Sequence, residues 1–286
     1  MSLSALTPMA TSDKPRILIT GAAGSIGSEL YRQLVKDNSL MAFDLNETGL
    51  FDLHEEYRLK GFDVHYRLGD IRDSDVVLNV FRSFKPDIVF HAAALKHVTP
   101  SEAYPRETVK TNVIGTLNVV AAAKETGVEK LVYVSTDKVI NSHSVMGVSK
   151  RMGELIARNA GYVAVRFGNV MRSRGSVLEI WERQLKQNEP ITITDERMER
   201  FMMTIPDACA LLVRAAEVGQ GGQVLVMDMG EPIRIVDLAR KFLEEHGKPD
   251  HEIKIIGIRP GESLTEGLMT PEELAGATKI DKFYIL

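Results

Sequence analysis

A hydroxyl, a carboxyl and an amine follow one another at Thr136, Asp137 and Lys138. They come directly after residues 131–134, an apolar run that predicts a buried strand. Ligands bind at the carboxyl ends of the strands in an open parallel sheet, so these side chains are expected to face a ligand. A neutral amine can act as a base and a protonated carboxyl group as an acid, so the three residues predict proton transfer.

A second pair of candidate residues lies on the helix that should follow. Lys150 comes about one helical turn after Met146, which places both side chains on one helix face. The thioether of Met146 cannot accept a proton, so Thr136 is expected to hydrogen-bond a substrate hydroxyl, with Asp137 or a water molecule taking the proton. A core methionine beside a solvated lysine is the alternative interpretation.

A glycine-rich turn follows the first predicted strand, residues 16–20, and leads into a predicted helix at residues 28–35. Its spacing is G-x-x-G-x-x-G, which lets the backbone approach a pyrophosphate at a helix N-terminus. Strand, turn and helix in this order predict a dinucleotide site. The cofactor-binding candidates in the turn are Gly21, Gly24, Ser25, Ile26 and Gly27.

Further cofactor candidates stand after the next three predicted strands, residues 39–43, 63–68 and 86–90. Asp44 has the spacing of a carboxylate that binds the adenosine ribose, which favours NAD over the alternative NADP, although it could instead serve as a helix cap. Asp70 and Ile71 are expected to frame the adenine. Small side chains at Ala92, Ala93 and Ala94 leave room for a ligand beside the backbone.

These strands alternate with helices, which predicts an α/β fold with a doubly wound parallel sheet of Rossmann type and a small mixed C-terminal lobe. We expect a flexible leader at residues 1–13, a dinucleotide-binding domain at 14–167 and a substrate lobe at 168–286, with the chain free to cross back between the two. Residues 108–124 predict one long amphipathic helix.

Bulk properties narrow the function. A net charge of −4 over 286 residues and a pI near 6.0 give no overall positive electrostatic field that would attract nucleic acid. The sequence also has no apolar run long enough to predict a membrane segment. The single cysteine, Cys209, favours a reducing cytoplasmic compartment and excludes a cysteine metal cluster. An anionic ligand must therefore be held locally. Arg172, Arg174, Arg200 and Arg259 lie on loops that could converge on a diphosphate.

The motifs taken together resemble a known family, the UDP-N-acetylglucosamine 4,6-dehydratases. These are extended short-chain dehydrogenase/reductases of polysaccharide biosynthesis, and the resemblance is to the branch with Met in place of Tyr. It covers roughly residues 16–268, and the short tail beyond matches little. The motifs are residues 21–27 (GAAGSIG), 91–97 (HAAALKH), 135–138 (STDK), 145–150 (VMGVSK), 166–169 (RFGN), 174–176 (RGS), 198–204 (MERFMMT) and 259–262 (RPGE). The chain departs from the family at Ser263, where Lys is usual, and at residues 100–104.

The resemblance implies an enzyme that oxidises a UDP-sugar at C4, eliminates water across C5 and C6, and returns the hydride to C6. It implies a tightly held, recycled NAD and a homodimer. Lys138 would be the base, with a pKa depressed towards 7 to 8, and Asp137 the acid, kept protonated. Lys150 would hold the nicotinamide ribose. The implied substrate-binding residues are Lys96, Asn169, Arg174, Ser176, Thr192, Arg200, Arg259 and Glu262.

Other functions remain open at this point. The same residues could also invert C5 during elimination, or epimerise the sugar at C2. A catalytically silent nucleotide sensor and a reductase that consumes its cofactor are two further classes.

Overall fold

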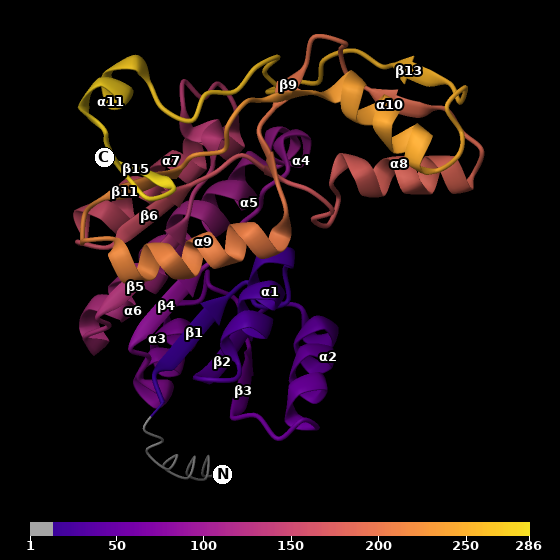
Figure 1. Ribbon diagram of the computed structural model, residues 1–286. Helices are drawn as coiled ribbons and strands as arrows, with labels where there is room; N and C mark the ends of the chain where they lie inside the picture. The colour runs from indigo at the N-terminus through magenta and orange to yellow at the C-terminus, as the bar shows by residue number, and fades with distance from the viewer. Residues whose placement is uncertain (1–13) are drawn as a thin grey trace.

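A computed structural model describes residues 14–286, and the predicted leader at residues 1–13 lies outside this range. Nine strands form one sheet (Figure 1). They are β1 (Arg16–Thr20), β2 (Ser39–Asp44), β3 (Val64–Leu68), β4 (Ile88–His91), β5 (Lys130–Val134), β6 (Val163–Arg166), β11 (Val224–Met227), β14 (Thr278–Ile280) and β15 (Phe283–Ile285).

The strand order is β14-β15-β11-β6-β5-β4-β1-β2-β3. In this order, every pair of neighbouring strands from β11 to β3 is parallel, and β15 and β14 add an antiparallel edge next to β11. The order 3-2-1-4-5-6 reverses between β1 and β4, which is where such folds bind a dinucleotide. The predicted doubly wound sheet is confirmed.

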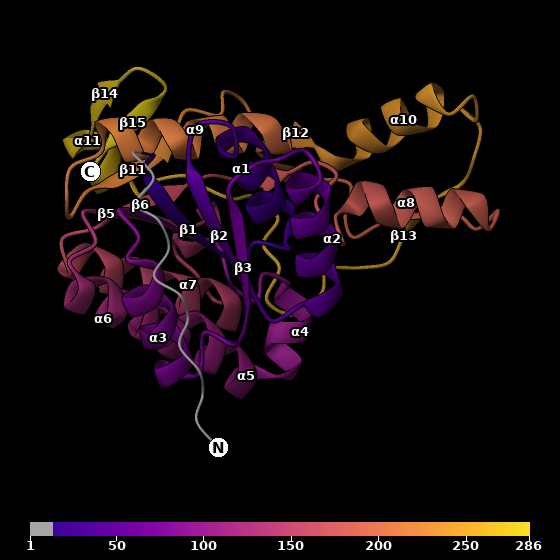
Figure 2. The ribbon, with the colours of Figure 1, turned by 90° about the horizontal axis from the view of Figure 1, so that it is seen from below.

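Helices cover both faces of this sheet (Figure 2). One face carries α1 (Ser25–Leu34), α2 (Glu47–Arg58) and α9 (Ile205–Val218), and the other carries α3 (Ser74–Phe84), α6 (Thr116–Thr126) and α7 (Val145–Asn159). The sheet is thus buried on both sides, which explains why its central strands are continuous apolar runs rather than alternating ones. Among residues 14–286, no helix combines the length and the apolar character needed to cross a membrane.

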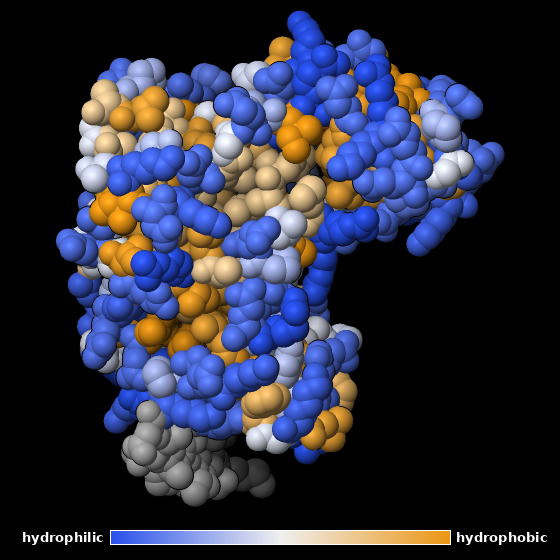
Figure 3. All heavy atoms as spheres, viewed as in Figure 1, coloured by the Kyte–Doolittle hydropathy of each residue, from blue (hydrophilic) through white to orange (hydrophobic). Residues whose placement is uncertain are grey.

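A smaller lobe projects beside the carboxyl edge of the sheet. It has its own core, in which Trp181 packs against Phe242. Its elements are α8 (Val177–Lys186), α10 (Ile235–Glu245) and the short strands β8 (Ile191–Ile193), β9 (Glu199–Arg200), β12 (Ile233–Arg234) and β13 (Ile253–Ile255). On the face shown in Figure 3, a hollow separates this lobe from the part of the body that carries α1 and α2.

The chain crosses between the lobe and the sheet more than once. After residue 167 it enters the lobe through β7 (Asn169–Val170), which pairs with β10 (Met202–Met203). It then returns to the body for α9 and β11, goes back to the lobe, and ends as β14 and β15. The tail beyond residue 268, which matched little in the resemblance, therefore completes the main sheet.

The single long helix predicted at residues 108–124 is wrong in detail. The segment is α5 (Pro105–Val109), a π-helical stretch η1 (Lys110–Gly115), and then α6. Within η1 the Asn112 side chain bonds the backbone N–H and C=O of Leu95 at 2.8 and 2.9 Å, and also Ser149. A Cβ on Gly115 would lie 2.6 Å from Ile71. The wider turn fits these close contacts, which periodicity cannot reveal.

A buried ion-pair network joins β5, β6, α7 and the short helix α11 (Pro271–Gly276). The Arg166 side chain at the end of β6 and Glu154 of α7 are both 0% exposed and form two hydrogen bonds of 2.7 and 2.8 Å. Arg166 also binds Glu273 of α11, and Ser135 donates to Glu154 at 2.8 Å. The network therefore holds the carboxyl end of β5 against α7.

Candidate active site

A cavity of about 1030 Å³ lies at the carboxyl ends of the strands and is also lined by the lobe. Most predicted site residues line it together. They are Gly21, Gly24, Ser25, Ile26, Gly27, Ala92, Ala94, Lys96, Thr136, Asp137, Lys138, Met146, Lys150, Asn169, Arg174, Ser176, Thr192, Arg200, Arg259 and Glu262. The predicted cofactor residues that do not line it are Asp44, Asp70, Ile71 and Ala93.

The glycine-rich turn forms a cradle at the start of α1. Gly21 has a φ of +70°, and a Cβ there would lie 2.7 Å from the backbone N of Ala93. A Cβ on Gly27 would collide with the Gly21 carbonyl. The N-cap, Gly24, has no side chain to satisfy the first N–H groups of the helix. Free N–H donors beside a surface kept clear of side chains fit a pyrophosphate, so the chain can hold a dinucleotide here.

The two acidic residues predicted to hold the adenosine have protein partners. Asp44 accepts hydrogen bonds of 2.9 Å from the backbone N–H groups of Ala23 and Asn46, and Asn46 rather than Asp44 caps α2. Asp70 pairs with Arg72 at 2.6 Å; burial disfavours its charge, but the hydrogen bonds and charge of Arg72 lower its pKa. Asp44 therefore holds the backbone of the glycine-rich turn in place.

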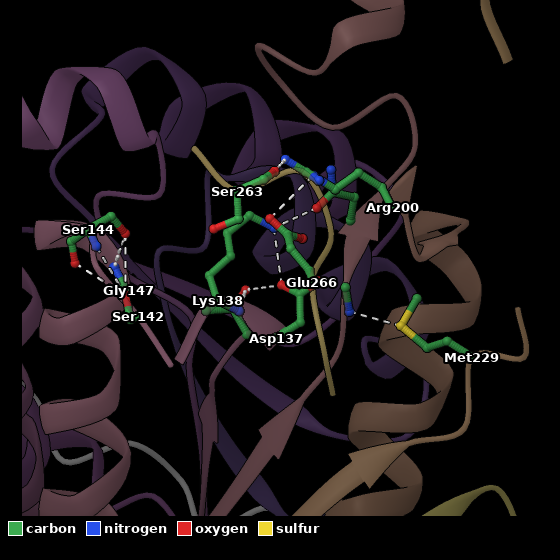
Figure 4. A network of polar contacts seen from close by, with 12 residues as sticks. Asp137, Lys138, Ser142, Ser144, Gly147, Arg200, Met229, Ser263 and Glu266 are labelled. Carbon is green, nitrogen blue, oxygen red and sulfur yellow. Dashed lines mark hydrogen bonds and ion pairs between the residues drawn. The ribbon is translucent and has the colours of Figure 1, made fainter. Parts of the chain in front are cut away.

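The acid and base candidates lie in one cluster at the end of β5 (Figure 4). Thr136, Asp137 and Lys138 enter the 3₁₀ turn η2 (Asp137–Val139), and Thr136 donates to Asp137 Oδ1 at 2.8 Å. Lys138 Nζ donates to Asp137 Oδ1 at 3.1 Å, to Asn169 Oδ1 at 2.7 Å and to Glu266 Oε2 at 2.8 Å. Asp137 Oδ2 is buried and has no hydrogen-bond partner among residues 14–286, so it can bind a ligand group.

The structure contradicts the predicted direction of both pKa shifts in this cluster. Burial disfavours the Lys138 ammonium, but the charges of Asp137 and Glu266 outweigh burial and raise the pKa of Lys138. Burial also disfavours the Asp137 carboxylate, but the Lys138 charge and the side-chain interactions with Glu266 and Thr136 lower the pKa of Asp137. The expectation of a neutral Lys138 and a protonated Asp137 is therefore wrong for this arrangement, in which the two form an ion pair.

Sequence reasoning missed Glu266. Its side chain is 7% exposed and lies between Lys138, at 2.8 Å, and Arg200 Nε, at 3.2 Å. Burial and the charge of Asp137 outweigh the charges of Lys138 and Arg200 and raise the pKa of Glu266 to about 7. The only local signal was an acidic residue four positions after Glu262, in a segment with no regular periodicity.

Met146 and Lys150 occupy the first turns of α7 as predicted. Met146 is 2% exposed and lines the cavity. Lys150 donates to the carbonyl of Val134 and lies 4.3 Å from the centre of the Tyr133 ring. Burial lowers the pKa of Lys150 to about 7, against the opposing charge of Glu154. The lysine is thus poised to change its charge near neutral pH.

Three of the four arginines predicted to bind a diphosphate line the cavity, and Lys96 lines it with them. Lys96 Nζ donates to Ser173 at 3.1 Å, and Arg174 binds the Ala23 carbonyl of the glycine-rich turn. Arg200 already binds Glu266 and the carbonyls of residues 199, 263 and 264. Arg172 does not line the cavity and pairs with Glu182 on the surface. Lys96, Arg174 and Arg259 are the residues best placed for an anion.

Ser176, the N-cap of α8, adds a polar group on the lobe side of the cavity. Its hydroxyl is buried without a hydrogen-bond partner in the described part of the chain. Thr192 binds Gln184 through its backbone and its hydroxyl. Across residues 14–286, no three His, Cys, Asp or Glu side chains are grouped so that they could hold a metal ion.

Comparison with known sequences identifies relatives over almost the whole chain. The family described as polysaccharide biosynthesis protein matches residues 17–286. The capsular polysaccharide biosynthesis protein CapD of Staphylococcus aureus is 40% identical over 282 residues, which are 94% of this chain and 47% of CapD. The chain spans about half the length of such relatives. A UDP-glucose 4-epimerase of Rickettsia bellii is 33% identical over 94% of this chain and 81% of its own length.

Solved structures share the fold. Pen from Bacillus thuringiensis has a TM-score of 0.90 and 36% identity, over 95% of this chain and 86% of Pen. The UDP-glucose 4-epimerase of Thermus thermophilus, solved in complex with NAD, has a TM-score of 0.77 and 25% identity, over 91% of this chain and 92% of its own. The fold is therefore the Rossmann-like fold of the extended short-chain dehydrogenase/reductases. The chain belongs to the family described as polysaccharide biosynthesis protein.

Proposed function

We propose that the protein is an NAD-dependent 4,6-dehydratase that converts UDP-N-acetylglucosamine to a UDP-4-keto-6-deoxy-hexosamine. The observation that carries this proposal is the buried cluster of Thr136, Asp137 and Lys138, in the same cavity as the dinucleotide cradle. A simple hydride transfer needs one proton acceptor, whereas elimination of water needs both a base and an acid. This cluster supplies both.

Gly21, Gly24 and Gly27 of the cradle would hold NAD, which would supply reversible hydride transfer with C4 and C6 of the sugar. The proton of the C4 hydroxyl would pass through Thr136 to Asp137, since Thr136 Oγ1 is 2.8 Å from Asp137 Oδ1. This route agrees with the lowered pKa of Asp137, because the carboxylate begins charged and can take a proton. Met146 contributes no proton acceptor and would shape the apolar side of the site.

Elimination then uses the same cluster, with Lys138 as the base and Asp137 now acting as the acid. The C4 ketone acidifies the C5 proton, and Lys138 removes it. Asp137 gives its newly acquired proton to the C6 hydroxyl, which leaves as water. As C6 takes up hydride, Lys138 gives a proton of its ammonium group to C5. The protons balance, because the C4 hydroxyl proton leaves in water and the proton lost from C5 is replaced by one from the Lys138 ammonium, whose protons exchange with solvent.

The wider site supports a UDP-sugar. Lys96, Arg174 and Arg259 give positive charge for a diphosphate in a chain that is acidic overall. Ser176 and Asn169 offer polar groups that line the same cavity. Lys150 would hold the nicotinamide ribose, and its position beside Val134 at the end of β5 fits that role.

An epimerase is the second candidate, because the relative in Rickettsia bellii is named a UDP-glucose 4-epimerase. A 4-epimerase would leave Lys138 without a proton to remove from C5. Inversion at C5 during elimination, or epimerisation at C2, would use the same cluster with a proton returned to the other face of the carbon.

Incubation with UDP-N-acetylglucosamine, without added NAD, tests the proposal. We expect the product to weigh one water less than the substrate, with no net change in the cofactor. In deuterated water the product should carry deuterium at C5, and its ring couplings report whether C5 is inverted. A product of unchanged mass would establish an epimerase instead. Net consumption of NADH would establish a reductase.

A further inference from the structure

Lys138 has an acceptor for each proton of its ammonium group. Asp137, Asn169 and Glu266 each provide one oxygen, at 3.1, 2.7 and 2.8 Å (Figure 4). An amine has three N–H donors only in its charged form, so this geometry fits the ammonium. A charged ammonium cannot remove a proton from C5. Lys138 must therefore pass one proton to a neighbour before elimination begins.

The three neighbours differ in their ability to take that proton. The amide oxygen of Asn169 is not basic enough to hold a proton near neutral pH. Asp137 is needed for the proton of the C4 hydroxyl and is already hydrogen-bonded to Thr136. Glu266 has neither restriction, and burial with the charge of Asp137 raises its pKa to about 7. The other charged groups that face it are Lys138 and Arg200.

Arg200 keeps Glu266 in position for this transfer. Its guanidinium binds Glu266 Oε1 at 3.2 Å and the carbonyls of Ser263 and Leu264 at 2.8 and 3.1 Å. These contacts hold the irregular segment that carries Glu266 against β9. One oxygen of Glu266 thus faces a fixed positive charge while the other faces Lys138, which suits a carboxylate that must both orient the amine and accept from it.

We propose that Glu266 accepts a proton from the Lys138 ammonium before elimination, and so creates the neutral amine that removes the C5 proton. The inference rests on the proposed function. One N–H bond breaks at Lys138 and one O–H bond forms at Glu266, and no oxidant or reductant is needed. Glu266 does not touch the sugar in this scheme; it is a positioning and proton-holding residue that acts through Lys138.

The substitution Glu266→Gln separates this role from simple electrostatics. Glutamine keeps the size and an oxygen for Lys138 but cannot take a proton. Loss of a nearby negative charge lowers the pKa of a lysine, so a purely electrostatic role predicts faster elimination in the variant. A proton-accepting role predicts slower elimination.

The experiment uses the full chain with NAD and UDP-N-acetylglucosamine, in single turnover. In Glu266→Gln we expect reduced nicotinamide to form within about threefold of the normal rate, because C4 oxidation does not involve Glu266. Loss of water and uptake of deuterium at C5 should fall by about 10²- to 10⁴-fold, the usual contribution of a proton-transfer group. In the unaltered protein the elimination rate should rise with pH around pH 7, and this rise should be absent from the variant.

Two further variants complete the test. Glu266→Asp keeps a carboxylate and should recover part of the elimination rate and its pH dependence. Glu272→Gln changes an exposed glutamate in the same part of the chain and should behave as the unaltered protein. Elimination by Glu266→Gln at the normal rate, or equal losses in Glu266→Gln and Glu266→Asp, would overturn the inference alone. Failure of the unaltered protein to release water would overturn the proposed function and the inference with it.

Discussion

In the family that the chain resembles, many members have a tyrosine at the position of Met146, and its hydroxyl would accept the proton of the C4 hydroxyl group. Here Thr136 supplies the hydroxyl instead. Thr136 Oγ1 is hydrogen-bonded to Asp137, whereas the buried Met146 offers only an apolar surface. The hydroxyl that passes on the proton of the C4 hydroxyl group is therefore expected at the end of β5 rather than on α7. This reassignment links the first proton transfer directly to the carboxylate that must later act as the acid.

Replacing these two residues separates their roles. Thr136→Val removes the hydroxyl at nearly constant volume and should slow C4 oxidation by about 10²-fold or more, since a proton-transfer contact is lost. Met146→Leu should leave oxidation within a few-fold, because the swap nearly preserves volume in a packed site. The measurement is the rate at which reduced nicotinamide forms after substrate is added. Equal damage in both variants would argue against a proton path through Thr136.

At the scale of the elements, His91 joins β4 to its neighbours. Its ring nitrogens lie 2.7 Å from the hydroxyl of Thr20 on β1 and 3.0 Å from that of Thr116 on α6. The residue is 1% exposed, and burial, helped by the charge of Lys150, lowers its pKa from 6.5 to about 3. His91 is therefore a neutral hydrogen-bonding bridge beneath the cavity.

This bridge predicts how stability depends on pH. Between about pH 3 and 6.5 the unfolded chain binds a proton at His91 that the folded chain does not, so stability is lost as the pH falls through that window. The expected loss is about 1.4 kcal/mol per pH unit, or about 2 kcal/mol at about pH 5.

Denaturant unfolding at several pH values, with His91→Gln as the comparison, measures this effect. The variant should be less stable at neutral pH, because it disturbs both hydrogen bonds, but its stability should change less on acidification. Parallel pH curves for the two proteins would show that His91 does not carry the dependence.

At the scale of the whole molecule, an apolar stripe stands exposed on neighbouring helices. Val148, Met152 and Leu155 of α7 are 39 to 48% exposed and follow one helix face, and Ile114 and Leu117 nearby are each 44% exposed. Apolar side chains gathered in this way mark a surface that another molecule covers. We propose that a second copy of the chain covers it, which agrees with the homodimer implied by the resemblance.

A charge placed in the stripe should break this assembly. Met152→Glu would bury a carboxylate at the centre of the interface and should give a monomer in sedimentation velocity at concentrations where the unaltered chain is a dimer. Leu59→Glu changes an even more exposed apolar residue, 75% exposed at the end of α2, and should leave the dimer intact. A monomeric unaltered chain, or a dimer that survives Met152→Glu, would contradict the proposal.

The sequence alone determined the features that depend on neighbours in the chain. The six central strands, the glycine-rich turn and the group at residues 136–138 follow from local apolar runs, glycine spacing and the rule that ligands meet strand ends. The change in pattern after residue 167 also predicted the C-terminal lobe. The family resemblance added the set of substrate-binding residues, which do line the same cavity. The π-helical turn at residues 110–115 and the closing strands at residues 278–285 were missed, because they arise from packing contacts rather than from periodicity.

Only the tertiary structure decided the charge state of the site. Asp137 and Lys138 are adjacent in sequence, but Glu266 reaches them from more than 120 residues away and Arg200 from the lobe. The pKa of a buried group depends on every charge around it in a medium of low polarity, and those charges come from separate segments. Residue types in order can therefore identify an acid and a base, but the fold determines which of them holds the proton.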